Sequence, residues 1–542
     1  MTTWTTTGLT AELCAVLTVR LGQPIGPDDD FFAMGGDSLI ALRVLADAAE
    51  RGIRLTLLDL LRHPSAAGLA AHLSAGAGEQ LADLDAGPGP AGVLPAADLA
   101  LAPAGVAELL TAGELPVGMI YLCDSSGDPE LYHSAIGFDV GLPFDEEWFA
   151  AALTGLCARH PALRSAFDLG SYSAPAQVVW AEPRAVPVTV VDAGEDPADT
   201  AWRQHLPIDW RTAPLTRGHV RRGTGSFRVT LVVHHAIVDG WSYGRLVVDL
   251  LTLYHGAVTG SVPALPVLPE AVHRRHAEAE QRAVADAGSA EFWRARADVP
   301  PLLFDRGRFA GAANAERSVR WTLPAGLVAG LRDAAARVRV PVKALALAAH
   351  QWALGGLAGR HHDVVTGVVV NTRPATPGSD LVVGLFLNTV PMRADRLDRT
   401  WAELAEAAHT AERESLPHHA YPLAHVERAL GRPAFDAVFN FTRFHVYDEL
   451  DALDSLRLGG WSVVGKPSFP LRVDFELGGR AEGDQVEVAY DPALLAVAAA
   501  ARFARLFGHA LRAAAADPFR SAGVPPADVP DRHRKDGHDG DH

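Results

Sequence analysis

Apolar residues near the start of the chain recur at helical spacing. The first predicted helix is marked by four of them, Leu13, Val16, Leu17 and Leu21. Residues three and four apart share a face of a helix, so these side chains can meet in one small core. A second helix is predicted from Ser38 to about Gly52, and a short third helix from about residue 66 to residue 72. Residues 8–74 are therefore expected to form a compact all-α bundle.

The longer part of the chain has a different pattern, in which strands alternate with helices. Between residues 106 and 520, short apolar runs typical of buried strands are followed by longer amphipathic segments. The predicted strands include Phe227–Val233, Val364–Val370 and Gln485–Tyr490, and the predicted helices include Glu146–Arg159, Ser242–Tyr254 and Pro492–Ala515. This alternation predicts a mixed α/β body.

Two further segments carry little apolar surface. Residues 75–105 are dominated by Gly, Ala and Pro and are predicted to form a linker that is docked in part. The tail, residues 521–542, is charged and contains Pro and Gly, so it is expected to be disordered. A chain of 542 residues is too long for one hydrophobic core. The linker is therefore expected to separate two folded units.

The composition narrows the kinds of partner. Hydrophobic residues make up 48% and charged residues 21% of the chain, a balance typical of globular proteins, and no apolar run is long enough to span a bilayer. A formal net charge of -17 argues against a nucleic-acid partner, which would require a clustered basic surface. The three cysteines, Cys14, Cys123 and Cys157, lack metal-ligand spacing, so no metal site is expected. The N-terminus lacks an export signal, and the cytoplasm is the expected compartment.

A serine follows a glycine pair at the start of the second predicted helix, in the sequence Gly35-Gly36-Asp37-Ser38. Glycines permit a sharp turn, and the positive end of a helix suits a phosphodiester attached to the serine oxygen. On its own, Ser38 is most simply interpreted as a helix N-cap. The whole unit, up to His63-Pro64-Ser65, nevertheless resembles a peptidyl carrier protein. That resemblance implies a 4′-phosphopantetheine arm on Ser38, attached by a phosphopantetheinyl transferase.

A second candidate site lies at the end of the predicted strand Phe227–Val233, which runs directly into His234 and His235. Strand alternation places His235 on the face of Val233 and His234 on the opposite face. The two histidines are therefore not expected to do the same job unless the strand ends between them. A histidine at the end of an apolar strand is often a hydrogen-bonded core residue, so the pair alone does not identify an active site.

Four motifs in order along the chain change that interpretation. They are Arg-His-x-x-Leu-Arg-x-x-Phe at 159–167, His-His-x-x-x-Asp-Gly at 234–240, Gly-x-Phe-x-Asn-Thr at 384–389 and His-x-x-Tyr-Pro at 418–422. Together they resemble the condensation domain of nonribosomal peptide synthetases, a two-lobed α/β relative of chloramphenicol acetyltransferase. The resemblance implies a first lobe of residues 106–275 and a second lobe of residues 276–520. Two segments, residues 115–121 and 269–282, depart from the family's pattern.

The resemblance also implies roles for single residues. His235 is expected to be the active-site histidine in a tunnel between the lobes, with His234 and Asp239 shaping that site. Gly240 is expected to keep the passage open, because any side chain there would crowd it. Structural support is expected from three more residues, Arg373 (paired with Asp239), Asn388 and Trp241.

These two units predict nonribosomal peptide synthesis. The carrier is expected to hold an acyl, aminoacyl or peptidyl thioester, which the condensation domain transfers to an amine to form an amide, as in antibiotic or other secondary-metabolite biosynthesis. Two alternatives are ester formation with a hydroxyl acceptor and recruitment of a partner without chemistry; the intact histidine motif favours catalysis. No adenylation motif occurs, so another protein is expected to load the arm. The acceptor is expected to be a separate carrier protein or a free small amine.

Overall fold

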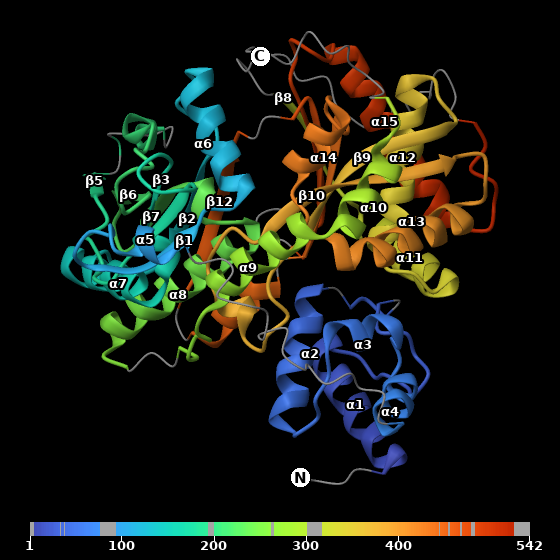
Figure 1. The fold of residues 1–542 in the computed structure, drawn as a ribbon, viewed down its shortest axis with the longest axis horizontal. Coiled ribbons are helices and arrows are strands. Elements are labelled where there is room, and N and C mark those ends of the chain that lie inside the picture. The colour runs from blue at the N-terminus through green and yellow to red at the C-terminus, as the bar shows by residue number, and fades with distance from the viewer. Residues whose placement is uncertain are drawn as a thin grey trace.

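The computed structural model of the protein shows a small helical unit beside two larger α/β lobes (Figure 1). It describes residues 5–32, 34–36, 38–75, 94–192, 194, 200–261, 265–300, 317–443, 445–453, 456–466, 469–478 and 483–524. No helix in these ranges combines the length and the apolar character needed to cross a bilayer. The same ranges contain no group of side chains arranged to hold a metal ion.

The N-terminal unit is the predicted all-α bundle. Its helices are α1 (Thr6–Leu21), α2 (Ser38–Glu50), α3 (Leu57–Arg62) and α4 (Ala66–Ser74). Leu13, Val16 and Leu17 are fully buried in its core, as their spacing predicts. Helix α3 was not predicted from the sequence, because its six residues are too few to show a helical period. That helix is fixed at its start by reciprocal hydrogen bonds between Thr56 and Asp59.

The end of the predicted linker packs against the first lobe. It contains the short helix α5 (Ala96–Leu99). Leu94 is buried against Leu109 and Val178, which belong to a three-stranded sheet in the order β1-β4-β3. The strands of this sheet are β1 (Val106–Thr111), β4 (Ala176–Trp180) and β3 (Ser165–Asp168). Residues 76–93 of the linker and residues 525–542 of the tail lie outside the described residues.

The main sheet of the first lobe has five strands in the order β12-β2-β7-β6-β5. They are β12 (Leu458–Gly465), β2 (His133–Val140), β7 (Phe227–His234), β6 (Thr216–Arg222) and β5 (Val188–Asp192), and the helices α6 (Glu114–Ser126), α7 (Glu146–Arg159) and α8 (Gly240–Thr259) accompany them. The predicted lobe boundaries of 106–275 and 276–520 miss one feature. Strand β12 comes from the later part of the chain and pairs antiparallel with β2, which satisfies the edge of β2 and joins the lobes.

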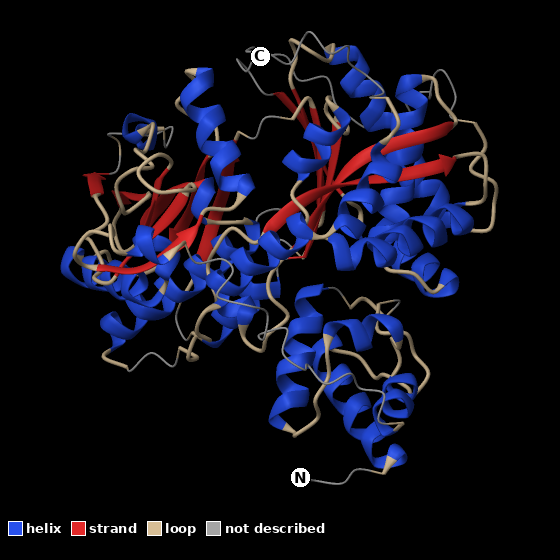
Figure 2. Cartoon of the chain, viewed as in Figure 1, coloured by secondary structure: helices blue, strands red, loops and turns tan. Residues whose placement is uncertain are grey.

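The second lobe is built on a six-stranded sheet in the order β10-β9-β11-β13-β14-β8. Its strands are β10 (Leu387–Arg396), β9 (His362–Asn371), β11 (Ala437–Arg443), β13 (Leu471–Leu477), β14 (Gln485–Tyr490) and β8 (Arg317–Thr322). The helices are α9 (Val272–Ala285), α10 (Ala287–Ala297), α11 (Ala325–Val338), α12 (Val342–Ala358), α13 (Trp401–Ser415), α14 (Leu423–Leu430) and α15 (Val497–Ala516). Helices flank the strands in both lobes (Figure 2).

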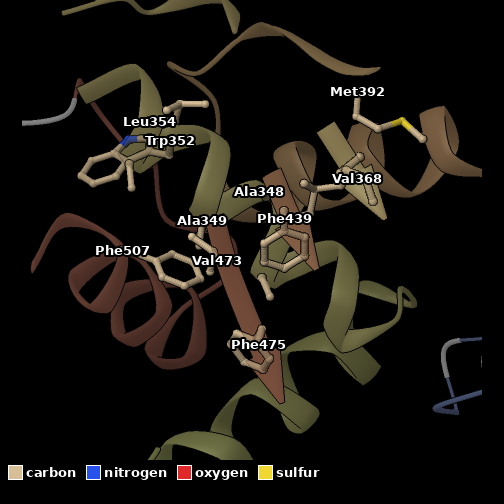
Figure 3. Packing of buried hydrophobic residues seen from close by; sticks show 14 of the residues in the cluster. Ala348, Ala349, Trp352, Leu354, Val368, Met392, Phe439, Val473, Phe475 and Phe507 are labelled. Carbon is tan, nitrogen blue, oxygen red and sulfur yellow. The ribbon is translucent and has the colours of Figure 1, made fainter. Parts of the chain in front are cut away.

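The core of the second lobe lies between this sheet and helices α12 and α15. Phe439 and Phe475 of the sheet pack with Trp352 of α12 and Phe507 of α15 (Figure 3), and all four are fully buried. The predicted bounds of α7 and β14 are confirmed. Helix α15 begins at Val497 instead of the predicted residue 492, because the preceding residues form turns on the carbonyl of Asp491.

Candidate functional site

His235 lies where strand β7 passes into a short 3-10 helix, η3 (His235–Ile237), which leads to α8. The strand ends between the two histidines, so strand alternation no longer relates them. The backbone N–H of His235 donates to the carbonyl of Tyr132 at 2.7 Å, which fixes the loop to the start of β2. Tyr132 itself has a φ of 52°, a left-handed conformation of the kind that clusters at functional sites.

The imidazole of His235 is partly buried. Its Nδ1 atom is buried without a hydrogen-bond partner, and its ring lies edge to face with Tyr243 at 6.2 Å between centroids. Burial lowers the pKa of His235 below its ordinary value, and the nearby backbone and the carboxylate of Asp239 oppose this in part. A neutral imidazole has one nitrogen lone pair free to accept a proton. His235 therefore has the protonation state of a general base near neutral pH.

His234 has different surroundings from its neighbour. It is fully buried, its Nδ1 accepts a hydrogen bond from the backbone of Ala236 at 3.1 Å, and its ring lies edge to face with His133. Burial lowers the pKa of His234 to about 3, with smaller contributions from His133 and His235. His234 is thus neutral and fixed in the core, where it supports the loop that carries His235.

Asp239 clamps the two lobes together. Its carboxylate caps α8 by accepting the N–H of Ser242 at 2.7 Å, and it accepts the N–H of Phe386 from the second lobe at 3.0 Å. Arg373 completes the contact with an ion pair at 2.9 Å, as the resemblance implies. The side chains of Arg373 and Asp239 are 2% and 4% exposed. We name these two residues the lobe clamp, because they hold the start of α8 against the segment before β10.

Gly240 and Trp241 follow the clamp as the first two residues of α8. A Cβ atom added at Gly240 would meet no atom within 4 Å, and the residue does not have a left-handed φ. Neither packing nor backbone conformation therefore requires glycine at this position. Trp241 is buried and donates from Nε1 to the carbonyl of Asp380 at 2.8 Å.

Asn388 lies on β10 and supports the backbone of the second lobe. Its Nδ2 donates to the carbonyls of His419 and Tyr421 at 2.9 and 2.7 Å. It therefore links two motifs that lie more than thirty residues apart in the sequence. Among the described residues, its hydrogen bonds all go to backbone groups, which is a structural role.

A pocket lies beside η3, lined by Ala236 and Ile237 of that helix. Its walls include Leu115 and Pro116 on one side and His276 and Glu280 on another, so the two segments that depart from the family's pattern meet here. Glu280 accepts the N–H of Glu114 at 2.9 Å, and burial raises the pKa of Glu280 to about 7. Glu280 was not predicted as a site residue, because a single glutamate in an amphipathic helix gives no sign of burial.

The start of α2 suits the predicted phosphodiester. Ser38 is the first residue of that helix, and its first turn contains no acidic residue. Gly35 has a φ of 94°, and a Cβ atom at Gly36 would lie 2.4 Å from the ring of Phe31. Both glycines are therefore required by the turn that precedes Ser38. This positive helix end is a suitable place for an attached phosphate group.

This helical unit also contacts the two lobes directly. Arg43 of α2 hydrogen-bonds Asp380 at 2.8 Å, and Arg443 donates to the carbonyl of Gly35 at 3.1 Å. In Figure 1 the helical unit lies below the lobes, and its helix α2 contacts η4 (Ser379–Leu381). The sequence did not predict a role for Arg43, because its partner Asp380 lies 337 residues away along the chain.

Comparisons with known proteins agree with this division. Residues 116–523 match the family described as Condensation domain, and residues 8–73 match the family described as Phosphopantetheine attachment site. The AMB antimetabolite synthetase AmbE of Pseudomonas aeruginosa is 35% identical over 493 residues, which are 86% of this chain and 22% of that protein. The phosphinothricin tripeptide synthetase PhsC of Streptomyces viridochromogenes is 30% identical over 354 residues, which are 60% of this chain and 32% of that protein.

Among solved structures, the condensation domain from the Monacolin K polyketide synthase MokA is similar in fold. It has a TM-score of 0.65 at 17% identity and covers 77% of this chain and 99% of that structure. The likeness is one of fold, since the identity is low. It agrees with the predicted two-lobed architecture. The chain spans less than a third of the two curated relatives named above, 22% and 32% of their lengths.

Proposed function

Because the chain belongs to the condensation-domain family and carries a phosphopantetheine attachment domain ahead of that domain, as its sequence predicts, we propose that it forms amide bonds. The acyl group comes from an arm on Ser38 and passes to an amine at His235. When attached, the arm supplies an acyl thioester, whose carbon–sulfur bond is exchanged for a carbon–nitrogen bond. AmbE and PhsC are both named as synthetases, which supports a role in peptide synthesis.

We assign to His235 the role of aligning the acceptor amine and accepting its proton. A free α-amine has a pKa of about 7.7–8.0, so a neutral fraction is present near pH 7 and its first deprotonation is a small part of the barrier. More is gained by aligning the amine and by removing its proton as the new bond forms. The lowered pKa of His235 supports this role, because a neutral imidazole can accept that proton. This partly buried imidazole is the observation on which the proposal depends.

The surroundings of His235 support catalysis over recruitment without chemistry. The buried pair of Asp239 and Arg373 fixes the start of α8 directly after the histidine loop. Gly240 leaves open space at the same place. A recruiting domain would need neither a neutral imidazole nor open space at Gly240. Ester formation would use the same residues. It differs from amide formation in its acceptor, which is a hydroxyl group instead of an amine.

The proposal implies several partners. A phosphopantetheinyl transferase attaches the arm to Ser38, an adenylating or acyl-loading protein charges it, and the amine comes on an acceptor carrier protein or as a free small amine. We favour the carrier-bound amine, because tethering raises its effective concentration above that of a dilute free amine. The cysteines of the described residues are free thiols, which supports a reducing cytoplasm as the compartment.

The test is a transfer assay with the arm of Ser38 loaded from an acyl-coenzyme A by a phosphopantetheinyl transferase. Free and carrier-bound amino acids serve as acceptors, and hydroxy acids test for ester formation. His235→Ala is expected to slow amide formation by about 10²–10⁴-fold while the melting temperature stays near that of the wild type. Ser38→Ala, the control, should gain no phosphopantetheine mass and form no product. Unchanged turnover in His235→Ala would contradict catalysis at this residue and favour recruitment.

A further inference from the structure

Arg43 of the carrier faces two acids and an aromatic ring of the condensation domain. Its Nε donates to Asp380 at 2.8 Å, and its Nη2 lies 3.5 Å from Glu449 of η6 (His445–Ala452). Its guanidinium also lies over the ring of Trp241, 5.5 Å from the ring centroid. The side chains of Arg43 and Asp380 are 17% and 5% exposed, so solvent screens this pair less than an exposed ion pair.

The three partners of Arg43 are held in place by contacts inside the condensation domain. The carbonyl of Asp380 accepts the indole N–H of Trp241, and Glu449 accepts a hydrogen bond from the buried Arg245 at 2.6 Å. These contacts do not involve the carrier. The acids therefore form a preorganised surface. Docking of a cation there costs little conformational entropy in the acids, because they are already held in place.

The other contacts between the carrier and the condensation domain depend less on which side chains the carrier has than the Arg43 contact does. Arg443 hydrogen-bonds the backbone carbonyl of Gly35, a group that every chain offers. Leu416 packs against the apolar core of the carrier, and Phe32 lies near the ring of His409 with centroids 6.3 Å apart. Apolar contacts of this kind accept many side chains of similar size. Among the contacts of the described side chains, that of Arg43 is thus the one that depends on a particular charged group.

The docking surface is continuous with the lobe clamp. Asp380 belongs to the short helix η4 (Ser379–Leu381). In the residues that follow, the carbonyl of Gly384 accepts the N–H of Asp239 at 3.0 Å, and the N–H of Phe386 donates to the carboxylate of Asp239. Residues 379–386 thus contact the carrier at one end and the clamp beside His235 at the other.

We propose, on the basis of the function proposed above, that Arg43 is the residue by which the condensation domain selects its donor carrier. The surface of Trp241, Asp380 and Glu449 fits a carrier whose second helix has an arginine five residues after the serine that bears the arm. A carrier with an acidic residue at that position is rejected by repulsion from the two acids. Docking through Arg43 also covers η4, which leads into the residues that hold the start of α8.

The test uses the full chain without the arm, so it depends neither on loading nor on transfer. Hydrogen–deuterium exchange of α2 and of residues 379–386 measures docking from both sides, and small-angle X-ray scattering measures how far the carrier separates. Arg43→Glu is expected to lower the ratio of docked to undocked carrier by about 10- to 100-fold, because it places a third acid against two others. Exchange should rise in both segments together, and the radius of gyration should increase.

Arg51→Glu is the matched control. It makes the same change of charge at the other end of α2, where Arg51 pairs with Glu12 inside the carrier at 2.9 Å. Its exchange and scattering should equal those of the wild type. Combining Arg43→Glu with Asp380→Arg should restore most of the protection, because the pair is rebuilt with its charges reversed. Arg43→Gln, a milder change, should show a smaller effect in the same direction.

The outcomes distinguish a failure of this inference from a failure of the proposed function. Wild-type exchange and scattering in Arg43→Glu would overturn it, as would a double variant no better protected than the single one. Phosphopantetheine added to Ser38 in Arg43→Glu would show that the carrier is still folded, so a gain in exchange would reflect undocking. A wild-type chain that docks through Arg43 but forms no amide would support this inference and contradict the proposed function.

Discussion

Two arginines of this protein each face a carboxylate, and their surroundings differ. Arg373 and Asp239 join the two lobes and are almost fully buried, with backbone N–H groups completing the contact. Arg43 and Asp380 join the carrier to the condensation domain, and the second acid there, Glu449, is 39% exposed. The first pair lies in the interior and the second at the margin of an interface.

This difference in burial fits a permanent contact between the lobes and a reversible contact with the carrier. A buried ion pair is costly to break, because removing one partner leaves the other charge buried. An ion pair at a margin can be replaced by water when the partners separate. The lobe clamp therefore suits a permanent site, whereas the Arg43 contact suits a carrier that leaves to be loaded and returns.

The largest expected effect breaks the permanent pair. Arg373→Ala should lower the free energy of unfolding of the condensation domain by about 3–5 kcal/mol, since it leaves Asp239 buried without its cation. Urea unfolding followed by tryptophan fluorescence measures this. Arg43→Ala is the matched comparison, and the same measurement should change by no more than about 1 kcal/mol. Equal effects of the two variants would contradict the distinction between permanent and reversible contacts.

Glu280 is a partly buried acid that, unlike Asp239 and Asp380, has no arginine partner in the described part of the chain. It accepts one backbone N–H, and burial raises its pKa to about 7. The folded state therefore binds this proton more tightly than the unfolded state. Its stabilising contribution is present below about pH 4.5 and is lost as the pH rises through about 7.

Glu280→Gln stays neutral at every pH, so it should escape that loss. Relative to the wild type, its free energy of unfolding should rise between about pH 4.5 and pH 7, by up to about 3 kcal/mol. Chemical unfolding at a series of pH values measures the difference. Glu270→Gln, at an exposed residue just before α9, is the control and should show no such trend. A pH-independent difference for Glu280→Gln would show that the carboxyl is not strained by burial.

The smallest expected effect on stability is at Gly240. Replacing it by alanine should leave the free energy of unfolding within about 1 kcal/mol of the wild type, because nothing packs at this position. Gly240→Leu should nevertheless slow transfer by about 10-fold or more, a barrier increase of about 1.4 kcal/mol or more, by filling the passage beside His235. Gly326→Leu is the matched control, since Gly326 also lies in the first turn of a helix with no atom near its added Cβ. Undiminished transfer in Gly240→Leu would contradict the open-passage role.

Local pattern was enough for much of the fold. The spacing of Leu13, Val16 and Leu17 predicted a helix whose buried face the structure confirms. Alternation along 227–233 predicted strand β7, and the resemblance to condensation domains implied the contact between Asp239 and Arg373. These features depend on periodicity and on short motifs, both of which are present in the order of residues. The carrier and condensation families were predicted from the same motifs and are confirmed by the comparisons.

The sequence by itself determined which elements form, where the glycine turn and the histidine motif lie, and which families the two units belong to. Tertiary structure alone decided which charges of the carrier and the condensation domain meet and which acids are buried. Nothing near Arg43 in the sequence predicts Asp380, nothing near β2 predicts that β12 closes its edge, and nothing near Glu280 predicts a raised pKa. The physical reason is that local conformation depends on neighbours along the chain. Desolvation and ion pairing instead depend on neighbours in space, which the chain brings together only when it folds.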